Sequence, residues 1–209
     1  MQFARIPHSR IERVLAALAL FLGLAASPAW AAPLDEARSL YEQQKYAEVD
    51  AVLEDQLQSG DASAEALMLS YRANREAGRM VTADRRITLL LERTENPATA
   101  LIIEAARAAE RAGSRSVALS RFLLYANQQK NKTPELREAL VFLSRHGTFP
   151  EQYRRFIEVY GADDQGWHLG SGLLQRLLEE GRPEVSLPFT EFLLEHYHSP
   201  NQVEHVEWR

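Results

Sequence analysis

The sequence predicts an all-α protein built as a solenoid of about five antiparallel helix hairpins. Glycines recur at a nearly constant spacing, at Gly78, Gly113, Gly147 and Gly181, and one further step back reaches Gln44. Helix-period apolar segments precede and follow each of these five positions, which we call the turn positions. A fixed period in the mid-thirties is typical of stacked helical hairpins. Because glycine adopts left-handed backbone conformations without a side-chain clash, we expect each turn position to end one helix and reverse the chain into the next.

Residues 1–31 are predicted to be a Sec-type signal peptide. Three arginines form a basic start, residues 14–26 are apolar, and residues 27–31 end the segment with small side chains at Ala29 and Ala31. We expect cleavage after Ala31, because cleavage one residue later would put Trp30 where a small side chain is required. An uncleaved anchor is the alternative, although the apolar run is shorter than the roughly 20 residues of a membrane-spanning helix.

Composition and charge exclude several functions. The chain contains no cysteine, which excludes disulfides, a lipid on an N-terminal cysteine, thiol nucleophiles and cysteine-type zinc sites. Residues 1–31 contain three arginines and one glutamate, so residues 32–209 carry 21 basic and 28 acidic residues, a net charge of −7. This charge disfavours general binding to nucleic acid or to anionic membranes. We therefore expect an exported bacterial protein, periplasmic or secreted, that is not a lipoprotein.

Residues 32–200 are expected to form the solenoid, and residues 201–209 a frayed C-terminal tail or a short docking segment. Ser63 is expected to cap the helix that follows it, and Asn96-Pro97 and Thr133-Pro134 each to place a cap before a proline at the first helical position. Pro188 should bend the last helix or delay its start to Leu187. The expected pairs are 33–43 with 47–57, 64–77 with 81–95, 98–112 with 116–129, the segment from Pro134 to Gly147 with the helix opened by Pro150, and, after a loop at 161–166, 167–180 with 184–198.

Together, the period, the helix-turn-helix unit and the turn glycines resemble the tetratricopeptide-repeat (TPR) family across residues 33–198. Five residues after each turn position, where the family favours alanine, stand Val49, Ala83, Ala118, Gln152 and Ser186; nine residues after, where it favours a large apolar residue, stand Leu53, Ile87, Phe122, Phe156 and Thr190. Seven residues before, where it favours a small residue, Ala37 and Ala106 fit, whereas Tyr71, Leu140 and Leu174 do not. The resemblance implies a right-handed solenoid. A generic helical-hairpin repeat stays open as the alternative for the last 60 or so residues.

No catalytic or metal site is expected. The chain lacks a phosphate-binding Gly-rich loop ending in Lys-Ser/Thr and a His-Glu-x-x-His motif. His196, His198 and His205 are interpreted as surface histidines, because residues two apart on a helix point to different faces. Asp163 and Asp164 are interpreted as part of a polar turn, since two carboxylates are too few oxygen ligands for Ca²⁺. We expect no cofactor and no enzymatic activity.

A row of arginines is the candidate binding site. Arg38, Arg72 and Arg107 stand six residues before successive turn positions, and Arg75 and Arg111 fall nearby on the same side; these five are the predicted site. Arg145 falls near the row in the fourth repeat. In the TPR family the position six residues before the turn lies on the inner, concave face, which commonly grips a peptide. The row is therefore a candidate groove for a carboxylate or an acidic peptide. The alternative is a solvated helix face whose arginines are neutralised by Glu42, Glu76, Glu104 and Glu110.

These features favour a non-enzymatic periplasmic scaffold or adaptor that binds protein partners in envelope assembly, export or secretion. The alternative is an accessory protein that binds a solute or an acidic peptide in the basic groove. The fifth repeat ends without an obvious polar capping helix, so homo-oligomerisation through this repeat is also expected.

Overall fold

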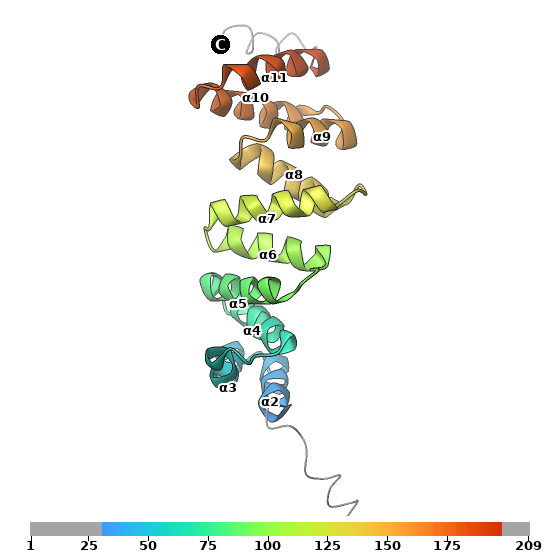
Figure 1. Ribbon diagram of the computed structural model, residues 1–209. Helices are drawn as coiled ribbons and strands as arrows, with labels where there is room; N and C mark the ends of the chain where they lie inside the picture. The colour runs from blue at the N-terminus through green and yellow to red at the C-terminus, as the bar shows by residue number, and fades with distance from the viewer. Residues whose placement is uncertain (1–30, 198–209) are drawn as a thin grey trace, which may run out of the picture. The chain divides into compact units, whose positions relative to one another are not determined.

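The computed structural model describes residues 31–197, so the expected signal peptide (apart from Ala31) and the tail 201–209 lie outside the described residues. The described residues form ten α-helices and no strand, in the order shown in Figure 1. None of these helices is both long and apolar enough to cross a membrane. The chain divides into two units, residues 1–79 and 80–209, and each is described separately.

The first unit contains three described helices, α2 (Ala31–Glu42), α3 (Tyr46–Ser59) and α4 (Ala64–Glu76). Helices α2 and α3 pack as a hairpin, and α4 packs against both. A polar contact also joins α3 to α4, because the Asp50 carboxylate accepts hydrogen bonds from the Ser70 hydroxyl and, at 3.1 Å, from the Asn74 amide. The apolar side chains buried in this unit include Leu34, Ala37, Val49, Leu53, Leu67 and Tyr71.

The second unit contains seven described helices, and from α5 to α11 each packs against the next along the chain. Helix α10 also contacts α8, so the first helices of two successive hairpins touch. Buried apolar side chains form one continuous cluster from α6 to α11. The all-α repeat of helix hairpins expected from the sequence is thus confirmed for the described residues. The helices are α5 (Met80–Arg93), α6 (Thr99–Arg111), α7 (Arg115–Gln128), α8 (Pro134–His146), α9 (Pro150–Tyr160), α10 (Asp164–Glu179) and α11 (Pro183–His196).

Four of the five turn positions adopt the expected left-handed backbone. The φ angles are 61° at Gln44, 74° at Gly78, 77° at Gly113 and 66° at Gly181. At each, the turn residue donates its N–H to the carbonyl three residues back, and the next residue donates to the carbonyl five residues back. These two bonds form the Schellman motif, which satisfies carbonyls left free at a helix end. The constant period therefore reflects a repeated way of ending the first helix of a hairpin.

Gly147 is the exception, and the prediction of a left-handed turn there is wrong. Its backbone is extended, with φ −116° and ψ −179°, and its N–H bonds only to the carbonyl of Leu143. A Cβ atom at Gly147 would collide with the ring of Phe149. Glycine is thus needed here for the close approach of an aromatic ring rather than for its backbone freedom.

The helix starts confirm two of the three predicted caps. The hydroxyls of Ser63 and Thr133 each accept a hydrogen bond, 3.1 Å long, from the N–H three residues on, and Pro134 occupies the first turn of α8. The cap predicted at Asn96-Pro97 is wrong. Ala98 is the extended cap residue, and its carbonyl accepts the first helical bonds, so α6 begins at Thr99.

The last two described helices begin earlier than predicted. Helix α10 starts at Asp164 instead of residue 167, because the Asp163 carboxylate caps it by accepting the Gly166 N–H at 2.7 Å. The predicted 161–166 loop is therefore shorter. Helix α11 starts at Pro183 and runs through Pro188, so the predicted delay of its start to residue 187 is wrong.

Candidate functional site

The five arginines of the predicted groove fall on three helices in two units. Arg38 lies on α2, Arg72 and Arg75 on α4, and Arg107 and Arg111 on α6. Within the first unit, Arg38 bonds to Asp35 at 2.7 Å and to Glu65 at 2.5 Å, which links α2 to α4. The three side chains of these two ion pairs are exposed to solvent.

The arginines of α4 and α6 differ in how far they are neutralised. Arg107 bonds to Glu138 of α8 at 2.6 Å and to Glu104 of its own helix at 2.8 Å, and Glu138 raises the pKa of Arg107 the most. Arg75 pairs with Glu76 at 2.7 Å and lies 5.7 Å from the centre of the Tyr71 ring. Glu76 and Glu104 therefore neutralise Arg75 and Arg107, as expected from the alternative of a solvated helix face. Arg107 in addition uses an acidic partner from the following repeat.

Arg72 and Arg111 are exposed, and within residues 31–197 neither takes part in an ion pair. Of the predicted row, these two keep a positive charge that no described carboxylate contacts. The structure brings Arg107 and Arg111 together on α6, whereas the other three lie in the first unit. The row as one continuous surface therefore stays a prediction.

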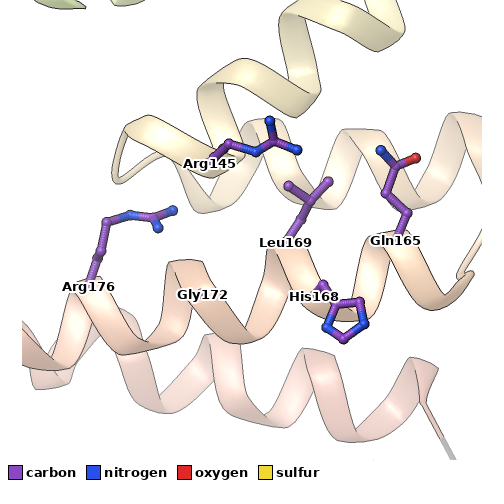
Figure 2. A pocket seen from close by; sticks show the side chains of 6 residues that line it. All are labelled: Arg145, Gln165, His168, Leu169, Gly172 and Arg176. Carbon is purple, nitrogen blue, oxygen red and sulfur yellow. The ribbon is translucent and has the colours of Figure 1, made fainter.

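A second group of basic side chains lines a surface pocket between α8 and α10 (Figure 2). The cavity has a volume of about 590 Å³, within the range of ligand-binding clefts. Figure 2 shows Arg145 on α8 facing Leu169, with Arg176 and Gln165 on either side of Leu169 along α10. We call this site the basic pocket; it is lined by Arg145, Gln165, His168, Leu169, Gly172 and Arg176.

Arg176 is held in place by uncharged groups. Its guanidinium donates to the carbonyl oxygen of Ser144 and, at 3.3 Å, to that of Gly147, both at the end of α8. Burial lowers the pKa of Arg176, and the charges of Glu179 and Glu180 partly oppose this shift. Arg145 is exposed and forms no ion pair with any residue the structure describes. Arg145 and the Nη1 side of Arg176 can thus contact an added anion, while Nε and Nη2 of Arg176 stay on the two carbonyls.

Positive charge also surrounds His146, next to Arg145, and the same Arg145 acts to lower the pKa of Glu110. Burial lowers the pKa of His146 the most, and the charges of Arg115, Arg145 and Arg176 lower it further. A histidine whose pKa is lowered by three cations lies in a region of positive potential. This region is unusual in a chain whose formal net charge is −5.

Two other pockets of the second unit contain acidic side chains. A pocket of about 280 Å³ between α6 and α8 includes Glu104 and Glu135 beside Arg107, and one of about 180 Å³ includes Glu110 beside Arg115. The basic pocket is larger than both, and no carboxylate lines it. By size and charge, it is the best candidate of these three pockets for binding an anionic group.

Sequence reasoning placed Arg145 near the predicted row but missed Arg176 and His168. Arg145 stands two residues before a turn position, in the same place in its repeat as Arg111. Arg176 has no such equivalent, because it lies five residues before Gly181 and its approach to α8 depends on helix packing. No periodic signal could have identified it.

The candidate metal ligands that the structure describes do not gather into a site. In the part of the chain that the structure describes, no three His, Asp or Glu side chains could hold a metal ion together. His196 stacks on Phe192 with ring centres 4.1 Å apart, and Asp163 caps α10. His198 and His205 lie outside the described residues.

Comparison with known proteins finds a likeness of fold only. No protein-family model matches the sequence, and no curated protein matches it. Among solved structures, the chain is similar to the nearly identical TPR-like repeats of a Podosopora anserina protein named as a putative kinesin light chain. One structure, of a variant with a single substitution, is 14% identical, with a TM-score of 0.42 over 78% of this chain and 92% of that one. The other is 15% identical, with a TM-score of 0.41 over 85% and 94%.

Proposed function

We propose that this chain is a non-enzymatic interaction scaffold of the bacterial envelope that binds an acidic segment of a protein partner in the basic pocket. The observation that carries the proposal is the pair Arg145 and Arg176. They line a cavity of about 590 Å³ that has no carboxylate of its own, in an acidic chain. Arginine is well suited to binding an acidic segment, because its planar guanidinium binds carboxylates through two parallel hydrogen bonds.

A peptide is the ligand class that the surroundings of the pocket favour. Leu169 and Gly172 provide an apolar floor between the polar side chains, and Gln165 can donate and accept hydrogen bonds through its amide. A segment that alternates acidic and apolar residues matches this arrangement. A small anionic solute is the second candidate, because the same two arginines would bind it.

The envelope location rests on the sequence of residues 1–31. A basic start, the apolar run 14–26 and small residues before the cleavage point are the features of an exported protein. Fractionation of cells that produce the full chain tests this proposal. We expect a periplasmic or secreted product that begins directly after Ala31, and an uncleaved cytoplasmic product would contradict it.

Binding is tested by the fluorescence anisotropy of a labelled twelve-residue peptide that is titrated with residues 32–209. The peptide repeats the triplet Glu-Leu-Ala. The same peptide with Gln in place of Glu is the reference. We expect the acidic peptide to bind at least ten times more tightly, because a hydrogen bond to a charged group contributes about 1.5–3 kcal/mol. Raising the salt concentration should weaken the binding.

Two charge reversals locate the site. Arg145→Glu should weaken binding of the acidic peptide about ten-fold or more, whereas Arg111→Glu, at the same place in the preceding repeat, should leave it within two-fold. Equal losses in both variants would assign binding to general charge, and a loss confined to Arg111→Glu would move the site to the row predicted from sequence. Equal binding of the acidic and the Gln peptide would overturn the proposal.

A further inference from the structure

Helix α10 contains three glycines, and close packing requires two of them. A Cβ atom at Gly166 would collide with the hydroxyl of Tyr197. A Cβ atom at Gly170 would collide in the same way with the hydroxyl of Tyr153. Both tyrosines are buried, and their hydroxyl oxygens lie 3.2 Å apart. Any larger residue at these two positions would therefore push α10 away from the buried rings.

The third glycine, Gly172, has no such neighbour. The nearest atom to a Cβ built there is Nη1 of Arg176, at 3.7 Å, which is an ordinary van der Waals distance. The backbone of Gly172 is helical, so the position does not need the left-handed conformations open to glycine. Alanine is the better helix former at such a position. Neither packing nor backbone conformation thus explains why residue 172 is glycine.

Gly172 lies in the middle of the basic pocket. His168, Gly172 and Arg176 are each four residues apart, so they share one face of α10, and all three line the pocket. Figure 2 shows Gly172 between Leu169 and Arg176 along the helix. Because residue 172 has no side chain, the lining of the pocket has a gap between the imidazole of His168 and the guanidinium of Arg176.

The gap adjoins the one nitrogen of Arg176 that its structural contacts leave open. Nε and Nη2, on one edge of the guanidinium, donate to the carbonyl oxygens of Gly147 and Ser144. Nη1 faces Gly172 and donates to none of the described residues. An acceptor oxygen must come within about 2.7–3.2 Å of this nitrogen to form a hydrogen bond. A methyl group 3.7 Å from Nη1 would occupy the space through which such an oxygen approaches.

We propose that Gly172 determines the specificity of the basic pocket, because the missing side chain admits the carboxylate of an acidic partner segment to Nη1 of Arg176. This inference rests on the function proposed above, and it adds the route by which the carboxylate reaches Arg176. Arg145, exposed on α8, offers its whole guanidinium to the same segment. A side chain at position 172 would shield Nη1 and leave Arg145 to bind the segment alone.

Gly172→Ala tests the inference by separating the effect on folding from the effect on binding. The midpoint of urea unfolding should stay at or above that of the wild-type chain, since alanine fits at this position and favours the helix. Gly170→Ala is the contrasting variant and should lower the midpoint, because its Cβ collides with the Tyr153 hydroxyl.

Binding is measured with the acidic peptide and the anisotropy assay described above. Gly172→Ala should weaken binding about ten-fold, which corresponds to the loss of one hydrogen bond to a charged group. Ser171→Ala is the matched control and should stay within two-fold of the wild-type chain. Ser171 is next to Gly172 but does not line the pocket, and its hydroxyl donates to the His168 carbonyl of its own helix at 3.3 Å.

Each other outcome overturns the inference in a recognisable way. Wild-type affinity in Gly172→Ala, with affinity lost in Arg145→Glu, would refute the role of Gly172 and leave the proposed function intact. A lowered unfolding midpoint in Gly172→Ala would show that this glycine serves the fold. Equal weakening in Ser171→Ala would assign the effect to α10 in general. A wild-type chain that binds the acidic and the Gln peptide equally would overturn the proposed function and this inference together.

Discussion

Replacing Arg121 by methionine should strongly destabilise the second unit. Arg121 lies on α7 and is only 8% exposed. Its guanidinium donates to the carboxylate of Asp84 on α5 at 2.6 Å and to the Thr88 hydroxyl on the same helix at 2.5 Å. It also donates to the carbonyl of Ala105 on α6 at 2.8 Å. One side chain thus joins three helices through a network that water scarcely reaches.

The magnitude follows from what the substitution leaves behind. Methionine fills a similar volume but donates no hydrogen bond, so the Asp84 carboxylate, 16% exposed, would lose its charged partner. Removing one member of a buried ion pair costs about 3–5 kcal/mol, because the other charge stays buried without compensation. Replacing Asp84 by leucine in the same chain should recover a large part of this loss, since the unpaired charge is then gone.

Urea unfolding at pH 7, followed by circular dichroism, measures these free energies of unfolding. Arg182→Met is the control, because the contacts of Arg182 with Glu180 and Glu184 are 3.7 and 3.9 Å long and exposed. This control should change stability by less than about 1 kcal/mol. A loss of similar size in Arg121→Met would refute the reasoning, since the Asp84 contact would then behave as a surface ion pair.

Three further predictions concern two glycines at turn positions and one titrating group. Gly113→Ala should cost about 1–2 kcal/mol in urea unfolding, because φ is +77° while nothing obstructs a Cβ there. Gly147→Ala should instead lose stability through the clash with Phe149, so its loss should shrink in a Phe149→Ala background, and equal losses in both backgrounds would contradict the clash. The pKa of His146 is lowered in the folded chain, so the unfolded chain binds the imidazole proton more tightly. The free energy of unfolding should therefore be highest above the unfolded pKa of about 6.5 and should fall as the pH drops from there through the folded pKa. His146→Gln should reduce this slope, and an unchanged slope in pH-dependent urea unfolding would refute it.

The all-α fold class and most of the turn conformations could be predicted from the sequence alone. Glycine or Gln44 stands where each left-handed turn ends a helix, and Ser63 and Thr133 cap the helices that follow them. These features were predictable because they depend on the backbone preferences of single residues and on hydrogen bonds between near neighbours. The large apolar residues nine after the first four turn positions were predictable for a similar reason, since helix periodicity alone selects a buried face.

Helix packing, in contrast, sets which charges are neutralised and where a pocket forms. Arg107 belongs to the periodic row, yet it pairs with Glu138, 31 residues away. Arg176 belongs to no row, yet packing of α10 on α8 brings it to the carbonyls of Ser144 and Gly147 and opens the basic pocket beside Arg145. Long side chains reach across helices, and their partners depend on the distance and rotation between those helices. Sequence periodicity specifies which face a residue occupies, but it does not specify what that face meets.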